Sequence, residues 1–196
     1  MAEISIEQIK KLKELSGVGL TDAKKALVEA DGDFDKALEA MRKKGLTKAE
    51  KRGDRETREG VIDAYIHDGR LGAIVEVNCE TSFVAKTDEF KTLAHQIAMQ
   101  VASMNPLYVS EDDIPEDVKA AKMKELETNF KGPENMKEQI LAGQAKKAFS
   151  DKVLMNQPYI LDDTKTVEQF IKEAIAKTGE NITVRQFKRI ELGVTE

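Results

Sequence analysis

Few residues in this chain have the types and spacing of a reaction site. Gly17-Val18-Gly19 has the glycines of a nucleotide loop, but it follows no predicted strand and lacks the Lys-Ser/Thr pair that binds phosphate. The two histidines, His67 and His95, have no evident nucleophile or acid partner that would make either a general base. A small enzyme is therefore the least favoured class, and we expect no catalytic residues.

The sequence also gives little support for metal or redox chemistry. The carboxylate pairs Asp112-Asp113 and Asp162-Asp163 lie where a turn or a helix start favours Asp, and their spacing does not fit a calcium loop. Cys79 is the only cysteine, so the chain has no intramolecular disulfide, and no adjacent cation would lower the pKa of its thiol. We therefore expect neither a metal nor a cofactor.

One segment is not explained by a structural role alone. Residues 78–86 join a predicted strand to a predicted helix, and Phe83 fits neither the strand alternation nor the apolar stripe of the helix. Phe83 either folds back onto the core as a lid or stays exposed on a rigidly based loop. An exposed aromatic there would suit insertion into a pocket of a partner. The pattern leaves both alternatives open.

Three short amphipathic helices are predicted over residues 1–45. Ser5 opens the first with a capping box, Thr21 and Asp33 are the expected caps of the second and third, and Gly45 is expected to end the third. Such a bundle buries little apolar surface and would be only marginally stable alone.

The rest of the chain predicts an α+β fold. Residues 46–59 are mostly charged with alternating sign, which favours a solvated helix or linker over a binding tail. Residues 60–196 then form the core domain. It begins with a hairpin that turns at Asp68-Gly69 and ends with a strand from about Ile182. We expect an antiparallel sheet of three strands, two adjacent in sequence and one distant, packed with helices.

The helices of this core are predicted from caps and apolar spacing. Thr87 opens the clearest amphipathic helix, which ends at Asn105-Pro106. Residues 113–149 are expected to be helical with a break at Gly132-Pro133. Residues 153–160 are expected to be extended, and a helix is expected from Thr166 to about Lys177.

Bulk composition narrows the class of partner. The chain has 196 residues, 40% hydrophobic and 34% charged, without an apolar run long enough to cross a bilayer. A net charge of −5 argues against sequence-independent nucleic-acid binding, and 5% aromatic content without Trp argues against a base-stacking surface. We expect a cytoplasmic protein that binds neither nucleic acid nor membrane.

Two motifs resemble a known family. Residues 15–27 (LSGVGLTDAKKAL) are similar to the N-terminal signature of elongation factor Ts, and residues 76–85 to its second signature, usually written T-D-F-V-A. Residues 156–159 and 185–193 are similar as well, so the resemblance covers nearly the whole chain in order. Ser82 stands where the family usually has Asp, and Ala23 replaces a common Cys.

The resemblance implies a short, bacterial-type translation factor of protein biosynthesis that is not an enzyme. Such a guanine-nucleotide exchange factor binds elongation factor Tu, in its GDP-bound and nucleotide-free forms, and promotes GDP release. The N-terminal bundle, similar to ubiquitin-associated (UBA-like) domains, would contact the nucleotide-binding domain of Tu. The loop with Phe83 would insert near the magnesium and phosphates. The expected partner-binding residues are Val18, Gly19, Leu20, Lys24, Thr81, Ser82, Phe83 and Val84.

The family also varies in size and assembly. Longer members carry a second core subdomain and a coiled-coil insertion, neither of which is evident in this sequence. Short members dimerise through the core sheet, so a homodimer is one expected state. The alternative is an adaptor that uses the N-terminal bundle to bind ubiquitin, although the loop with Phe83 has no role in that interpretation.

Overall fold

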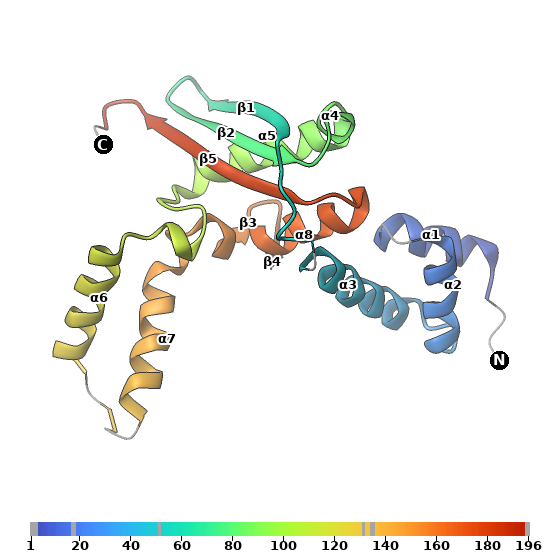
Figure 1. Cartoon of the computed structure of the whole chain (residues 1–196), viewed down its shortest axis with the longest axis horizontal. Coiled ribbons are helices and arrows are strands. Elements are labelled where there is room, and N and C mark those ends of the chain that lie inside the picture. The colour runs from blue at the N-terminus through green and yellow to red at the C-terminus, as the bar shows by residue number, and fades with distance from the viewer. Residues whose placement is uncertain (1–3, 17–18, 51, 131, 134–135, 195–196) are drawn as a thin grey trace. The chain divides into compact units, whose positions relative to one another are not determined.

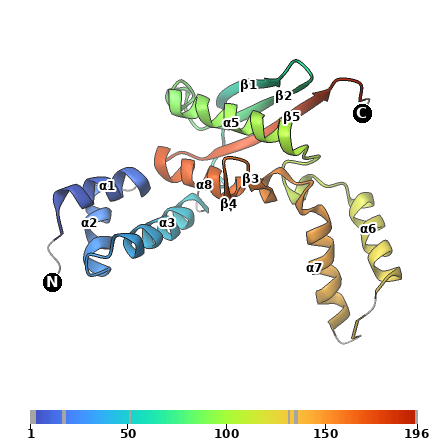
Figure 2. The same ribbon diagram turned by 180° about the vertical axis from the view of Figure 1, so that it is seen from behind.

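The computed structural model describes residues 4–16, 19–50, 52–130, 132–133 and 136–194 (Figures 1 and 2). The chain divides into two compact units. The first comprises residues 1–63, 76–95 and 168–185, and the second comprises residues 64–75, 96–167 and 186–196. The fold is α+β, as predicted: three N-terminal helices precede a three-stranded antiparallel sheet that is packed with helices.

The N-terminal bundle consists of α1 (Ile6–Ser16), α2 (Leu20–Glu29) and α3 (Phe34–Glu50). Its core is made of apolar residues from all three helices: Ile9, Leu12, Ala23, Ala26, Leu27, Ala37 and Met41. The predicted caps at Ser5 and Asp33 are confirmed. The N–H of Gln8 donates to Ser5 Oγ at 3.1 Å, and that of Lys36 donates to Asp33 Oδ1 at 3.1 Å.

Two boundaries of the bundle differ from the prediction. Thr21 does not cap α2, because the helix already begins at Leu20 with Gly19 as its N-cap. The third helix does not end at Gly45 but continues to Glu50, into the segment predicted as a charged linker. One helical glycine costs only about 1 kcal/mol relative to Ala, and the good helix formers around it, together with the buried Ala49, outweigh that cost.

The sheet has the order β1-β2-β5, formed by β1 (Glu59–His67), β2 (Leu71–Cys79) and β5 (Ile182–Glu191). The hairpin turn is as predicted: Asp68 and Gly69 have φ values of 49° and 65°, the left-handed pair that a type I′ turn requires. From Ala73 to Val77 of β2, buried residues alternate with more exposed ones, so one face of this part lines the core, whereas the last three residues of the strand are all buried.

Helices pack against this sheet. The long helix α5 (Asp88–Met104) lies behind the strands in Figure 1 and in front of them in Figure 2, and so covers one face. Its predicted cap is confirmed, because the N–H of Phe90 donates to Thr87 Oγ1 at 3.2 Å. The predicted apolar stripe is buried throughout: Phe90, Leu93, Ala94, Ile97, Ala98, Val101 and Ala102. The helix expected from Thr166 is α8 (Val167–Thr178).

The second unit contains the helices α6 (Glu116–Thr128) and α7 (Lys137–Ser150), which pack against each other. The sequence located them on either side of Gly132-Pro133 but did not predict that they pair. The sequence predicted one extended segment over residues 153–160, and that prediction is wrong. These residues form a short 3-10 turn, Leu154–Asn156, and then β3 (Pro158–Tyr159).

A strand that the sequence did not predict pairs with β3. This strand, β4 (Asp162–Thr166), is antiparallel to β3, with Pro158 opposite Thr166 and Tyr159 opposite Asp162. Its residues are all polar, so the apolar alternation that signals a half-buried strand is absent. The Asp162-Asp163 pair was interpreted as a turn or helix start, and that assignment is wrong.

Two buried glutamines hold this small sheet in the second unit. Gln100 Nε2 donates to Gln157 Oε1 and to the Pro158 carbonyl, each at 3.1 Å. Gln157 Nε2 donates to the carbonyls of Met104 and Asp151 at 3.2 and 2.7 Å. Buried amides are costly unless paired, and here each side-chain amide has partners. The motif at residues 156–159 is therefore explained by packing.

The bundle core provides a test of marginal stability. Leu27 is completely buried, whereas its neighbour Val28 is 55% exposed. Replacing Leu27 by Ala should cost about 2–5 kcal/mol, enough to unfold so small a bundle, while Val28→Ala should change stability by less than about 0.5 kcal/mol.

Hydrogen exchange measured on the full chain would check this prediction. In Leu27→Ala, amides of α1, α2 and α3 should lose protection, while those of β2 and α5 keep it. Equal protection of the bundle in both variants would show that Leu27 does not limit its stability.

Candidate functional site

The segment with Phe83 is a short helix, α4 (Ser82–Ala85), rather than an irregular loop. Phe83 is 80% exposed, whereas the next two residues, Val84 and Ala85, are buried. Of the two alternatives that the sequence left open, the lid is wrong and the exposed aromatic is confirmed. Ser82, next to Phe83, is also exposed, and the burial of Val84 helps to hold the segment in place.

Threonines fix both ends of α4. Thr81 is its N-cap, because the Thr81 Oγ1 accepts the N–H of Val84 at 3.4 Å. Ser and Thr hydroxyls commonly cap helices in this way. At the other end, Thr87 Oγ1 donates to the Val84 carbonyl at 2.8 Å while it also caps α5. The exposed ring of Phe83 therefore stands on a backbone with little freedom to move.

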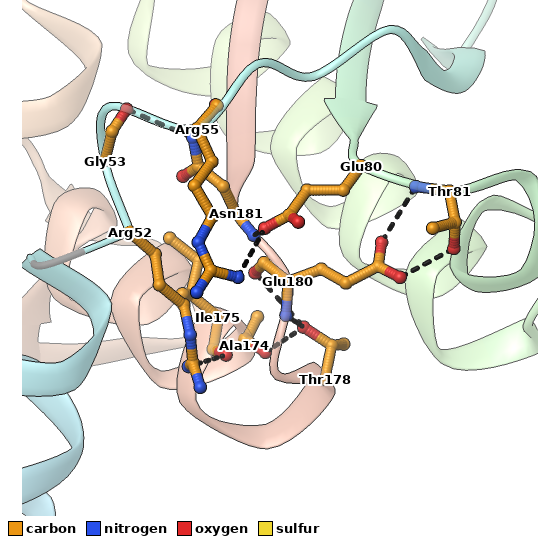
Figure 3. Close-up of polar contacts among 10 residues, drawn as sticks. All are labelled: Arg52, Gly53, Arg55, Glu80, Thr81, Ala174, Ile175, Thr178, Glu180 and Asn181. Atoms are coloured by element: carbon orange, nitrogen blue, oxygen red, sulfur yellow. Dashed lines mark hydrogen bonds and ion pairs between the residues drawn. The ribbon is translucent and has the colours of Figure 1, made fainter.

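Glu180 holds the start of the segment from a distant part of the chain (Figure 3). One of its carboxylate oxygens accepts the backbone N–H of Thr81 at 3.0 Å, and the other accepts the Thr81 hydroxyl at 2.6 Å. Hydrogen bonds to an ionised acceptor are stronger than neutral ones. Sequence reasoning missed Glu180, because it identified residues 179–181 only as a turn.

A second set of contacts surrounds the first (Figure 3). Glu80 Oε1 accepts the backbone N–H of Asn181 at 2.6 Å and lies 3.4 Å from the Arg55 guanidinium. The side-chain amide of the buried Asn181 donates to the carbonyls of Gly53 and Arg55 at 3.1 and 2.7 Å. Three segments distant in sequence, namely residues 53–55, 80–81 and 180–181, thus meet at the base of α4.

Cys79 lies at the entrance to this segment and is fully buried. Its thiol donates to the Thr81 carbonyl at 3.3 Å. Burial, aided by the negative charge of Glu180, raises the pKa of the Cys79 thiol to about 11. The group is therefore a protonated thiol at neutral pH and packs as a small apolar side chain.

Of the predicted contact residues of the bundle, Leu20 and Lys24 lie on α2 and Gly19 is its N-cap. Gly19 and Lys24 are exposed and Leu20 is 51% exposed. Leu20 and Lys24 are one helical turn apart and so share a face of the helix. Val18, also predicted, lies outside the described residues. The structure brings Thr81, Ser82, Phe83 and Val84 together in one segment and places the bundle residues on a separate helix surface.

The two histidines have polar neighbours. His67 Nδ1 lies 3.0 Å from the Tyr65 hydroxyl near the hairpin turn, and His95 Nδ1 lies 3.3 Å from Asp63 Oδ1. Within the described residues, no group of three or more His, Cys, Asp or Glu side chains has the geometry to hold a metal ion. In the same part of the chain, no helix is both long and apolar enough to cross a membrane.

Comparison with known proteins decides the family. The family model described as "Elongation factor TS" matches residues 7–194. The chain belongs to the elongation factor Ts family. Elongation factor Ts of Thermotoga maritima is 52% identical over 193 residues, covering 97% of each chain, and that of Moorella thermoacetica is 48% identical over 195 residues, covering 97% of this chain and 96% of the other.

A longer relative matches equally well. Elongation factor Ts of Rippkaea orientalis is 50% identical over 199 residues, which cover 98% of this chain and 80% of the relative. Because the family match covers almost the whole chain, this protein is a translation elongation factor that acts in protein biosynthesis.

The buried thiol makes stability depend on pH. Because the pKa of Cys79 is about 11 when folded against an ordinary 9.0, the folded state holds this proton more tightly than the unfolded state. The free energy of unfolding should therefore fall as pH rises from about 9 to about 11, with a contribution from Cys79 of about 1–2 kcal/mol.

Urea unfolding at about pH 8 and about pH 10.5 would measure this contribution, with Cys79→Ala as the matched reference for all other titrating groups. The wild type should lose more stability than the variant between the two pH values. Parallel losses would show that the thiol ionises as freely in the folded chain as in the unfolded one.

Proposed function

We propose that this protein is the guanine-nucleotide exchange factor of elongation factor Tu, and that it promotes GDP release by inserting Phe83 near the magnesium and phosphates. The exposure of Phe83 on a four-residue helix, fixed by Thr81 and Thr87, is the observation that carries the proposal. An aromatic anchor held in place before binding loses little conformational freedom on docking.

The mechanism needs no covalent step. Exchange is a coupling between two ligands of Tu: if this protein weakens GDP binding by some factor, GDP weakens binding of this protein by the same factor. A positioned apolar ring acts by displacing groups of Tu that hold the nucleotide. On this proposal the protein is not an enzyme and works in the cytoplasm, where translation takes place.

Phe83 alone does not supply enough free energy. A thousandfold faster release requires a barrier lower by about 4 kcal/mol. Burying one phenylalanine is worth roughly 1.5–3 kcal/mol. The remaining free energy must come from other contacts with Tu, so the two surfaces have different roles: one anchors the complex, and Phe83 acts on the nucleotide site.

We assign the anchoring contact to the N-terminal bundle. Gly19, Leu20 and Lys24 present an apolar residue and a cation on one side of α2, next to the exposed Val28 one further turn along. An apolar centre with a charged neighbour is typical of protein–protein contact surfaces. The proposed division of the chain is thus a Tu-binding bundle, a linker and a core, with the helix α3 reaching beyond the predicted limit at residue 45.

Release of a fluorescent GDP analogue from elongation factor Tu tests this proposal. The wild type should accelerate release. Phe83→Ala should lower the maximal rate about ten- to a hundredfold, which is the burial free energy of the ring expressed as a rate, and Phe83→Leu should fall between them. Leu20→Ala should instead raise the concentration needed for half-maximal effect, because it weakens anchoring.

Leu161→Ala is the matched control, since Leu161 is another exposed apolar side chain outside both surfaces. It should leave release unchanged. An unaltered rate in Phe83→Ala would move the acting group elsewhere in the chain. If the wild type does not accelerate release of the GDP analogue from a cognate Tu, the proposed function is overturned and the ubiquitin-binding adaptor becomes the favoured alternative.

We also propose a second copy of this chain as a partner. Ile66 of β1, Ile74 of β2 and Ile190 of β5 are large, exposed apolar side chains on the three strands of the sheet. Exposed apolar side chains clustered on one element are typical of protein–protein contacts. A homodimer formed through this sheet would bury them.

Sedimentation velocity over a range of concentrations tests the homodimer. The wild type should sediment as a dimer, and Ile74→Lys should shift it to monomer, because a lysine in the interface would bury an unpaired charge. Leu161→Lys, which adds the same charge outside the sheet, should remain dimeric. A wild type that is monomeric at high concentration would exclude this interface.

A further inference from the structure

The turn between α8 and β5, residues 178–181, connects two other parts of the chain (Figure 3). Gly179, with φ of 79°, allows the chain to reverse, and the Thr178 hydroxyl closes the turn by accepting the Glu180 N–H at 3.3 Å. The same hydroxyl donates to the Ala174 carbonyl at 2.9 Å. After Gly179, the Glu180 side chain points toward Thr81 at the start of α4, whereas the Asn181 side chain points toward the carbonyls of Gly53 and Arg55.

The carboxylate of Glu180 matches the donors that Thr81 offers. Its two oxygens accept the backbone N–H and the hydroxyl of one residue, which fixes the position and the rotamer of Thr81 together. With its proton directed at Glu180, the hydroxyl presents lone pairs to the N–H of Val84. The cap of α4 therefore depends on Glu180.

A four-residue helix has no stability of its own, because helix nucleation is unfavourable and only longer helices recover that cost. The shape of α4 must come from contacts at its ends and from the burial of Val84 and Ala85. Phe83 lies two residues beyond Thr81 and has no comparable contacts with the core, since 80% of it is exposed. Its direction is thus set by the fixed backbone.

Asn181 adds a link to the segment that follows the bundle. Its side-chain amide uses both protons on the Gly53 and Arg55 carbonyls, and its backbone N–H donates to Glu80. Nearby, the Arg52 guanidinium donates to the Ile175 carbonyl at 3.3 Å. The turn thereby holds both the end of β2, from which α4 starts, and the linker from the N-terminal bundle.

We propose that Glu180 is a positioning residue for nucleotide exchange, which acts through Thr81 to hold Phe83 in its inserting orientation. The inference rests on the proposed function, and it assigns a role to a residue outside the two signature motifs. Glu180 itself lies at the base of the segment and needs no contact with Tu or with the nucleotide.

Exchange kinetics with three variants test the proposal in the full chain. Glu180→Ala should lower the maximal rate of GDP-analogue release about tenfold, because it removes two hydrogen bonds to a charged acceptor, while the half-maximal concentration stays close to that of the wild type. Glu180→Gln should recover much of the rate, since its amide can accept from the Thr81 N–H and donate to the hydroxyl. Asp163→Ala, which removes an exposed carboxylate from β4, should match the wild type.

A double-mutant cycle with Phe83→Ala separates positioning from a general loss of structure. If Glu180 acts through Phe83, adding Glu180→Ala to Phe83→Ala should cause almost no further loss. Independent losses that multiply in the double variant would overturn the proposal. So would a Glu180→Gln variant no better than Glu180→Ala.

Hydrogen exchange of the Thr81 and Val84 amides tests the contact without Tu. Both should be protected in the wild type and exchange at least about tenfold faster in Glu180→Ala, with the amides of β2 unchanged. Equal exchange in the two proteins would overturn the proposal whatever the kinetics show. If the wild type fails to accelerate GDP release, the proposed function and the role of Glu180 in it both fail, even where the amides confirm the contact.

Discussion

The hydrogen bonds between Thr81 and Glu180 join residues that are 99 positions apart, and the exposed end of the molecule's candidate site depends on them. An exposed aromatic ring is useful for binding only if its backbone is held, because a mobile one would lose its freedom on docking. The core cannot hold Phe83 by packing, since the ring faces away from it. Polar contacts at the base of α4 therefore hold the backbone of this segment in place, as apolar burial does elsewhere in the fold.

This arrangement separates two demands that usually conflict. A side chain in the core is rigid but inaccessible, and one on a surface loop is accessible but mobile. In the segment around α4, Val84 and Ala85 are buried, Thr81 and Thr87 fix the two ends, and Phe83 is left outside. The buried neutral thiol of Cys79, directly before the segment, adds apolar packing to the same base.

Local signals in the sequence predicted much of the fold. The caps at Ser5, Asp33 and Thr87 depend on spacings of three residues, and the turn at Asp68-Gly69 depends on two adjacent residues, so each is visible without knowledge of the tertiary structure. The three-stranded sheet was predicted from this hairpin together with the apolar strand pattern that begins at Ile182. The signature around Phe83 directed attention to a segment that proves to be a short helix with an exposed aromatic side chain.

What the sequence did not predict lacks a local signal. Glu180 and Asn181 form a turn in sequence, and only the fold brings them to residues 53–55 and 80–81. The polar strand β4 has no apolar alternation, because its partner β3 is held by buried glutamines instead. The extent of α3 past Gly45 was missed because a breaker was given more weight than the helix formers around it.

The distance in sequence between Thr81 and Glu180 has a consequence for how the chain matures during its own synthesis. The bundle and the β1–β2 hairpin form from contacts close in sequence and can assemble early, while the chain is still being elongated. The base of α4 lacks the Glu180 carboxylate and the Asn181 N–H until residues 178–181 emerge. The N-cap of α4 is thus completed late, so a nascent chain can form its N-terminal bundle before Glu180 fixes the Phe83 segment.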